Sequence, residues 1–464
     1  MPIDSALHAA LTVIFDPEAF STDPAECLAY GYDNSRRQAQ PDAVVYPTTH
    51  AQVVALVRAC RDARAPLIAR GRGTNTTGAT VPVRGGVVTS FERMNRILRI
   101  DVENRYAVVE PGVLNGDLQA ALAAHGFFWP PDPTSSPYCT IGGNLACNAA
   151  GPRAVKYGSC RENTLGLRAV AGTGEEFRSG VYTSKGAMGY DLTRLMIGAE
   201  GTLAVITEAT LKLTPKPVAK RTLSAAYADT AAAAAAVARI MAQPIIPCAL
   251  EFLDDESLRL ARTHGGDAIP TSGALLIVEV DGDPQDLSRA ADAIAHAARG
   301  PGMQDLRIAT DAAEVQTLWA ARRALSPALR TLSPNKINED VVVPVSRLPE
   351  LIAGLRAISA KYTIPIVGFG HAGNGNIHVN LLPRDAAEQQ RAEAALTHVF
   401  DLVIALDGAL SGEHGIGLAK RDFLAKALDP NALELMRRIK SQFDPDGILN
   451  PGKLLPEEGL RAEG

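Results

Sequence analysis

Short apolar runs separated by glycine-rich loops fill the first half of the chain. Apolar runs of about four to eight residues bounded by turn-forming residues predict short strands. We expect them at residues 42–46, 66–69, 86–89, 107–110, 165–170 and 203–207. Residues 49–64 instead carry apolar side chains at helical spacing behind a capping threonine, Thr48 or Thr49, and predict an amphipathic helix.

The pattern changes after residues 213–217, where two closely spaced prolines predict a linker. Strands are then expected at 221–228, 248–253, 274–280 and 305–309, and helices at 230–242 and 284–298. Two βαβ units in this order predict a ferredoxin-like layout. Residues 444–453, rich in Pro, Gly and Asn, predict a loop rather than a core element.

Composition places the chain among ordinary globular proteins. Its 464 residues predict two or three domains, and 46% are hydrophobic and 21% charged. A net charge of −5 argues against a nucleic-acid partner. The six cysteines form no Cys-x-x-Cys pair, no apolar run approaches the length of a membrane span, and the first residues lack a basic signal-peptide region. We expect a cytoplasmic protein, with peripheral attachment at the inner membrane left open.

Two histidines, His371 and His378, bracket a glycine-rich stretch that contains Asn374-Gly375. Asn-Gly is a strong signal for a two-residue type I′ hairpin turn, because both central residues need a positive φ. Such a turn would place the two histidines directly opposite one another, with Cβ atoms roughly 4.5–5.5 Å apart. That spacing suits two nitrogens that share one metal ion.

A Glu413-His414 pair follows 35 residues after His378. Glu413 could supply a third ligand, which leaves His414 as a base. Two nitrogens and one carboxylate suit zinc, manganese or ferrous iron. A lone histidine is more often a structural residue than a ligand, but the surrounding glycines favour the approach of a substrate over packing.

Three glycine-dense motifs occupy the first half of the chain, at residues 69–78, 140–151 and 198–203. Glycine lets backbone N–H groups approach an anion closely. The first motif has neither Walker nor Rossmann spacing, and each motif alone could be a plain loop. Together they favour an extended cradle for a dinucleotide.

In this order, the motifs resemble the vanillyl-alcohol-oxidase or PCMH-type family of FAD-linked oxidases. The resemblance is carried by residues 109–112, 141–144, 200–203, 370–378, 412–417 and 450–453. It covers about residues 40 to 455, and the most similar branch contains D-lactate dehydrogenases, glycolate oxidase flavin subunits and D-2-hydroxyglutarate dehydrogenases. It implies an α+β fold with a PCMH-type FAD-binding domain at residues 1–215, a ferredoxin-like substrate (cap) domain at 220–405, and a helical C-terminal segment at 406–464 that packs back on the FAD domain.

The resemblance also implies FAD, held without a covalent bond because no histidine lies in the first glycine-rich loop. It assigns cofactor binding to Arg70, Gly71, Arg72, Gly73, Thr74, Asn75, Pro133, Thr134, Gly142, Gly143, Asn144, Asn148, Gly151, Glu200, Gly201, Ile206 and Asn450. Arg72 and Asn75 stand where many members have glycine, and Ala204 stands at a third such position. Whether Arg72 and Asn75 line the pyrophosphate or point away from it is left open.

For the catalytic residues, the resemblance assigns a divalent metal to His371, His378 and Glu413. It assigns proton abstraction from a 2-hydroxyl group of the substrate to His414. It also assigns substrate binding to three residues, through the carboxylate or a hydrogen bond: Arg322, Lys336 and Ser326. The expected enzyme oxidises a D-2-hydroxy acid by hydride transfer to flavin N5.

Among substrates, a D-lactate-like acid ranks ahead of glycolate and D-2-hydroxyglutarate. An electron acceptor such as a quinone, a cytochrome or an electron-transfer flavoprotein is expected as a partner, and a homodimer is compatible with the sequence. Two alternatives remain: a metal-dependent hydrolase, which would leave the glycine-dense motifs unused, and a flavin-binding subunit without catalysis of its own.

Overall fold

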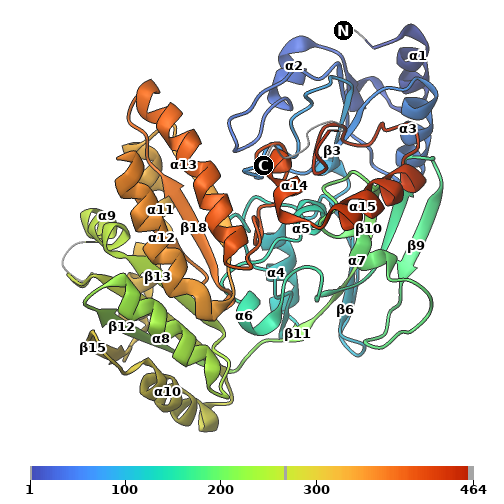
Figure 1. Ribbon diagram of the computed structural model, residues 1–464. Helices are drawn as coiled ribbons and strands as arrows, with labels where there is room; N and C mark the ends of the chain where they lie inside the picture. The colour runs from blue at the N-terminus through green and yellow to red at the C-terminus, as the bar shows by residue number, and fades with distance from the viewer. Residues whose placement is uncertain (1–2, 266–268, 458–464) are drawn as a thin grey trace. The chain divides into compact units, whose positions relative to one another are not determined.

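The apolar runs expected to form strands in the first half of the chain do so in the computed structural model, which describes residues 3–265 and 269–457 (Figure 1). One sheet has the strand order β1-β2-β4-β3. Its strands are β1 (Phe20–Ser21), β2 (Ala43–Val45), β4 (Val87–Ser90) and β3 (Leu67–Arg70). A second sheet has the order β5-β6-β10-β8-β9. Its strands are β5 (Ile97–Asp101), β6 (Tyr106–Val109), β10 (Ala204–Lys212), β8 (Thr164–Ala171) and β9 (Glu176–Gly180).

The amphipathic helix predicted at residues 49–64 is confirmed as α3 (His50–Asp62). Thr49 caps it in a capping box with Gln52, so the second of the two candidate threonines is the cap. The apolar stripe of α3 is fully buried in the core that β2 and β3 share. Other helices accompany these sheets: α1 (Ser5–Ile14), α2 (Pro24–Ala29), α4 (Asn115–Ala123), α5 (Ile141–Cys147), α7 (Leu192–Met196), α14 (Leu424–Ala427) and α15 (Pro430–Phe443).

The loop expected at residues 444–453 is irregular, but the prediction that it lies outside the core is wrong. Ile448 and Leu449 are 2% and 0% exposed and belong to the same core as α3. The amide of Leu67 donates to the carbonyl of Ile448 at 2.8 Å, and the carboxylate of Asp444 accepts the amides of both core residues. Because these groups satisfy its backbone, an irregular segment can be buried here.

The second half of the chain forms a seven-stranded sheet of order β15-β12-β14-β13-β17-β18-β16. Its strands are β12 (Ala219–Tyr227), β13 (Ala249–Asp254), β14 (Ala274–Gly282), β15 (Met303–Ile308), β16 (Ile337–Val342), β17 (Ile366–Gly370) and β18 (Asn376–Leu381). The expected helices α8 (Thr230–Ala242) and α10 (Pro284–Ala298) form with the predicted bounds. The order β15-β12-β14-β13 confirms the ferredoxin-like layout.

The remaining strands extend this sheet beyond the predicted unit. β16, α12 (Leu348–Tyr362), β17, β18 and α13 (Ala386–Ala405) repeat the βαββα order, with β18 between β16 and β17. The two halves join edge to edge, where Phe252 on β13 lies opposite Gly370 on β17.

Helices cover both faces of the seven-stranded sheet. α13, α12, α8 and α10 lie side by side across one face (Figure 1). α9 (Asp255–Gly265) and α11 (Ala312–Leu332) pack together over the other face, in a core that includes Leu253 and Phe369. Strand alternation therefore sends Phe252 toward α8 and Leu253 toward α9 and α11.

The chain divides into two units. Unit 1 contains the residues up to Ala150, Gly158–Lys216 and those from Glu413 onward; unit 2 contains Gly151–Tyr157, which includes α6 (Ala154–Tyr157), and Pro217–Gly412. This division differs from the expected ranges, because residues 151–157 and 406–412 belong with unit 2. The expected linker also contains a short strand, β11 (Thr214–Pro215), which pairs with β7 (Phe127–Phe128).

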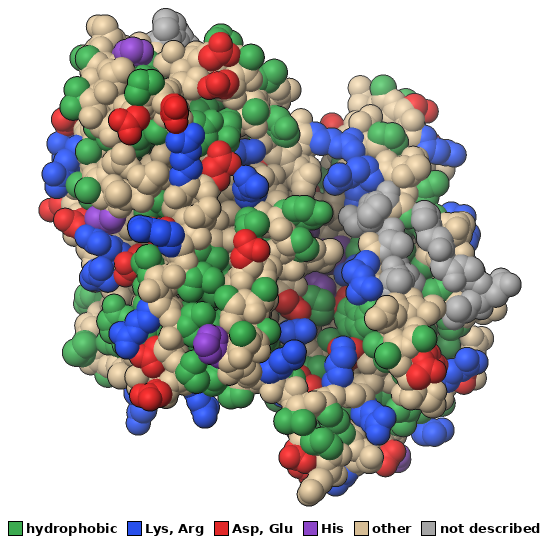
Figure 2. Space-filling model, turned by 180° about the vertical axis from the view of Figure 1, so that it is seen from behind, with side chains coloured by type: hydrophobic (Ala, Val, Ile, Leu, Met, Phe, Trp, Pro, Cys, Tyr) green, Lys and Arg blue, Asp and Glu red, His purple; other side chains and the backbone are tan. Residues whose placement is uncertain are grey.

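Surface composition agrees with the weak net charge of −5. Acidic and basic side chains are interspersed over the face seen from behind (Figure 2). Within the described residues, none of the helices combines the length and apolar character needed to cross a bilayer.

Gly86→Ala should lower the stability of the fold strongly. Gly86 lies in the loop before β4 and closely approaches the backbone before β3. Gly86 has φ +86°, and an added Cβ would overlap the carbonyl oxygen of Pro66. Gly126 also has a positive φ (+76°) but faces open space, so Gly126→Ala is the matched control. Both changes carry the left-handed cost of about 1–2 kcal/mol, and overpacking adds roughly 1–3 kcal/mol at Gly86 alone. Unfolding midpoints from circular dichroism measure the difference; equal midpoints would contradict it.

Candidate active site

The loop between β17 and β18 is longer than the sequence predicts. His378 lies opposite Phe369 rather than opposite His371, so the predicted register is wrong. His371 instead precedes a 3-10 turn, η5 (Ala372–Asn374). Of the Asn-Gly pair, only Gly375 has a positive φ, at 73°, so the pair does not form a type I′ turn.

Tertiary packing explains this departure. Ala372 is fully buried, and the amide of Val343 donates to the carbonyl of Gly375 at 3.1 Å. A Cβ on Gly373 would press against Val155 of α6 at 2.7 Å. The loop is therefore packed against other segments at the ends of two interior strands, and its conformation is set by neighbours that are distant in sequence.

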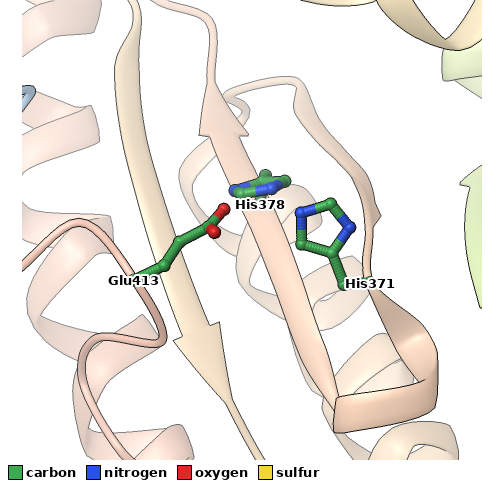
Figure 3. A group of neighbouring side chains, drawn as sticks. All are labelled: His371, His378 and Glu413. Carbon is green, nitrogen blue, oxygen red and sulfur yellow. The ribbon is translucent and has the colours of Figure 1, made fainter. Parts of the chain in front are cut away.

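The two imidazoles nevertheless meet. Their ring centroids are 5.2 Å apart with an interplanar angle of 85°. Donor atoms of His371, His378 and Glu413 all lie within 4.8 Å of one another, and the three side chains point toward one another (Figure 3). Glu413 directly follows Gly412, whose amide donates to the carboxylate of Asp340 at 2.8 Å. Since Asp340 lies opposite His378 in the sheet, this bond fixes the chain beside the histidines.

This donor set fits a divalent metal. Two ligands of one zinc ion lie no more than about 4.2 Å apart, so small side-chain rotations would suffice to close the group around an ion. Two imidazole nitrogens and one carboxylate oxygen also leave a coordination position for substrate. Both histidines are buried, at 5% and 7% exposed.

Glu251, which the sequence reasoning missed, supports this group from β13. Its carboxylate is 0% exposed and lies 2.5 Å from Nδ1 of His371 and 2.7 Å from Nε of Arg322. Burial would raise the pKa of Glu251, but His371 and Arg322 hold that pKa down to about 2. A carboxylate at this distance accepts a hydrogen bond from Nδ1 of His371, and in the neutral imidazole this arrangement would leave Nε2 as the nitrogen that can bind a metal.

Arg322, the predicted carboxylate-binding residue, lies on the same face of the sheet as Glu251. Its guanidinium is buried, pairs with Glu251 through Nε and lies 4.5 Å from the centroid of the Phe369 ring. The guanidinium has further N–H donors on Nη1 and Nη2, which suit a carboxylate. The neighbouring Arg323 is exposed. The side chain of Ser326 lies outside the described residues.

Lys336, which directly precedes β16, contacts the strand that carries His378. Its Nζ donates to Oδ1 of Asn380 at 2.7 Å. Asn380 is two residues beyond His378 on β18, so both side chains lie on one face of that strand. Lys336 therefore places a second positive charge on the sheet face that carries the histidines.

In unit 1, the structure brings the glycine-dense motifs together. A Cβ on Gly71 would collide with Oγ1 of Thr140, and one on Gly201 would lie 3.6 Å from Ala69. The amide of Glu200 donates to the carbonyl of Ala146 at 2.9 Å. Asn450 joins them, since its Nδ2 donates to the carbonyls of Ala79 and Glu200.

The two departures from glycine in the first motif have different environments. Arg72 pairs with Glu92 at 2.9 Å, and its side chain is half exposed. Asn75 donates from Nδ2 to the backbone carbonyl of His414 at 2.8 Å, and its Oδ1 accepts the amide of Thr77. Arg72 thus has an acidic partner on the surface, whereas Asn75 ties the motif to the backbone of the proposed base.

Other predicted cofactor residues have structural partners. Arg70 donates to the carbonyl of Tyr32 at 2.7 Å, and its guanidinium packs against Gly73. The Oδ1 of Asn144 accepts from Asn115, and that of Asn148 accepts from Ser159.

The remaining predicted positions are more dispersed. Thr74 lies in the first motif, its carbonyl facing Asn34. Gly142 packs on Pro111, and Gly143 donates to Thr140. Pro133 accepts the amide of Ser136 in a turn that also contains Thr134, and Ile206 lies on β10. Gly151 belongs to the segment grouped with unit 2.

Glu200 does not offer its carboxylate to the glycine motifs. The carboxylate accepts the amides of Ile416 and Gly417 at 2.5 and 2.8 Å, and so holds the segment that follows His414. Full burial raises the pKa of Glu200 to about 7, although these two amides and Lys420 and Lys453 lower it.

Comparison with known proteins identifies the family. Residues 216–454 match the model of the C-terminal domain of FAD linked oxidases, and residues 41–180 match that of an FAD binding domain. The chain belongs to the FAD-linked oxidase family. It is 40% identical to glycolate oxidase subunit GlcD of Bacillus subtilis, with 97% of each chain covered. It is 34% identical to D-lactate dehydrogenase of Anaerostipes hadrus, with 90% of each chain covered.

A solved structure shows the same fold. p-Cresol methylhydroxylase with bound substrate superposes with a TM-score of 0.82 at 17% identity, over 98% of each chain. The predicted combination of a PCMH-type FAD-binding domain with an FAD oxidase C-terminal domain is therefore confirmed. This family member is an FAD-linked oxidoreductase, which replaces the hydrolase alternative.

The buried carboxylate of Glu200 predicts a pH-dependent stability. Its pKa rises from 4.5 to about 7 on folding, so between these values the folded chain binds a proton that the unfolded chain has lost. The stabilising contribution of Glu200 therefore falls as the pH rises through this window. Glu200→Gln cannot ionise at this position, so its unfolding midpoint should rise relative to that of the wild type as the pH rises over the same range. Unfolding midpoints of both proteins measured across the window test this; a constant difference would contradict it.

Proposed function

We propose that this FAD-linked oxidoreductase oxidises a small 2-hydroxy acid, of the D-lactate or glycolate type, to the 2-oxo acid with the help of a divalent metal. The observation that carries the proposal is the group formed by His371, His378 and Glu413, whose donor atoms lie within 4.8 Å of one another. Arg322 and Lys336 add positive charge on the same sheet face. Metal ligands next to cationic side chains suit a substrate that has a hydroxyl group beside a carboxylate.

In the proposed reaction, Arg322 and Lys336 bind the carboxylate, and the hydroxyl oxygen lies toward the metal ligands. When bound, the metal lowers the pKa of the hydroxyl, and FAD accepts the hydride from C2. His414 takes the hydroxyl proton, as an imidazole is suited to do near neutral pH. Asn75 holds the backbone carbonyl of this base, and Glu200 holds the segment that follows it.

The different exposure of Arg322 and its neighbour Arg323 favours a substrate with one carboxylate. Arg322 is 8% exposed and faces the sheet, whereas Arg323 is exposed. One guanidinium rather than two is therefore directed toward the proposed substrate. This supports D-lactate or glycolate ahead of D-2-hydroxyglutarate, which has a second carboxylate to bind. Relatives are named for all three substrates, as glycolate oxidase subunit, D-lactate dehydrogenase and D-2-hydroxyglutarate dehydrogenase, so the proposed order rests on the two arginines.

The electron acceptor is proposed by class alone. Reduced flavin must pass its electrons to a quinone, a cytochrome or an electron-transfer flavoprotein. The relative from Bacillus subtilis is named as a subunit, which supports electron transfer within a larger assembly.

Anaerobic mixing with D-lactate, L-lactate, glycolate or D-2-hydroxyglutarate tests the proposal. We expect D-lactate or glycolate to bleach the visible flavin absorbance. Chelation with EDTA should abolish bleaching while FAD stays bound, and added Zn²⁺ or Mn²⁺ should restore it, because the ligand group serves the substrate rather than the flavin.

The two halves of this experiment have separate contradicting outcomes. If none of the four acids bleaches the flavin, the proposed substrate class is wrong. If bleaching is unaffected by chelation, the metal role of His371, His378 and Glu413 is wrong.

His414→Ala should retain FAD and metal but slow flavin reduction by roughly 10²–10⁴-fold, the usual contribution of a general base. His398→Ala is the matched control, because His398 is exposed on α13 and hydrogen-bonds to Tyr362. Stopped-flow reduction with the preferred acid measures both variants. Reduction of the His414 variant at the wild-type rate would remove His414 from this role.

A further inference from the structure

The carboxylate of Glu251 contacts two groups that the proposed function uses separately. Oε1 lies 2.5 Å from Nδ1 of His371, and Oε2 lies 2.7 Å from Nε of Arg322. Each oxygen thus serves a different partner. Glu251 is 0% exposed, and the side chains of its two partners are also buried.

Neighbouring aromatic rings restrict both partners. The guanidinium of Arg322 lies 4.5 Å from the Phe369 centroid, and that ring lies 5.6 Å from the His378 ring. His378 in turn contacts His371 edge to face at 5.2 Å. Glu251 therefore closes a packed ring of contacts that joins the proposed metal ligands to the proposed carboxylate-binding residue.

We infer that Glu251 is a positioning residue that sets metal affinity and hydroxy-acid affinity together. It orients His371 so that Nε2 faces the metal, and it orients Arg322 so that Nη1 and Nη2 face the substrate carboxylate. This inference rests on the proposed function.

Chemistry supports a shared role rather than two independent ones. A carboxylate behind a ligating histidine fixes the tautomer and the ring orientation, and its loss usually weakens metal binding 10–100-fold. The same carboxylate holds the arginine at a fixed angle. The two partners donate to different oxygens of Glu251, whereas a glutamine keeps an accepting oxygen at one of these positions and places a donating NH2 group at the other, so one of the two hydrogen bonds is lost.

Glu279→Gln provides a matched control. Glu279 is a buried carboxylate on the adjacent strand β14, and it also accepts a hydrogen bond from α11, from Nε1 of Trp319 at 2.8 Å. Trp319 is one helical turn before Arg322, and the other partners of Glu279 include Thr222 and Lys220. The control therefore removes a comparable charge from the same layer without changing a partner of His371 or Arg322.

The experiment compares wild type, Glu251→Gln and Glu279→Gln as FAD-bound proteins. Zn²⁺ and Mn²⁺ are each titrated alone into chelator-treated protein, and KM and kcat for the preferred acid are then measured with metal in excess. We expect Glu251→Gln to bind metal 10–100-fold more weakly and to raise KM roughly tenfold or more, with unchanged FAD content. Glu279→Gln should match the wild type in both measurements.

A Glu251→Gln protein that keeps either the metal affinity or the KM of the wild type overturns the inference. If Glu251→Gln fails to fold, Glu251→Asp serves instead: its charge remains but its shorter side chain cannot reach both partners, so one or both affinities must fall. Equal losses in Glu279→Gln would also overturn it, since they would indicate a general effect of removing a buried charge. Failure of the proposed function is distinguishable, because the wild type itself would then bind no metal or ignore chelation.

Discussion

The buried carboxylate of Glu251 determines how the polar side chains of the proposed site in unit 2 are arranged. An unpaired charge at the position of Glu251, in the middle of a sheet, would cost several kcal/mol. His371 and Arg322 remove that cost by donating to its two oxygens. Since both partners must stay where Glu251 can reach them, the loop after β17 and the buried face of α11 are fixed relative to each other.

A second buried carboxylate has a comparable part in unit 1. Glu200 accepts two amides of the segment that begins after His414, and Asn75 donates to the carbonyl of His414. On the other side of the Glu413-His414 dipeptide, Gly412 is held by Asp340 in unit 2. The dipeptide lies where the chain passes from unit 2 to unit 1, and each of its ends is fixed by a different carboxylate.

Periodic segments were predictable, and irregular ones were not. The helices at 230–242 and 284–298 form with the expected bounds, because amphipathic spacing and an N-terminal aspartate cap are local properties of those segments. The hairpin prediction at Asn374-Gly375 failed because Val343 and Val155 pack against that loop. Glu251 gave one usable signal, a charge within an apolar strand, but its partners lie 71 and 120 residues away.

Taken alone, residue type and spacing predicted the ferredoxin-like layout of the second half, a cradle for a dinucleotide and the three side chains that form the candidate metal group. The resemblance to FAD-linked oxidases then implied that the dinucleotide is FAD. All of these are properties of the chain itself. Only the tertiary structure decided the register around His371, the burial of Leu449 and the pairing of Glu251 with both His371 and Arg322. Each depends on contacts between segments far apart in sequence, where packing and the cost of burying charge outweigh local preference.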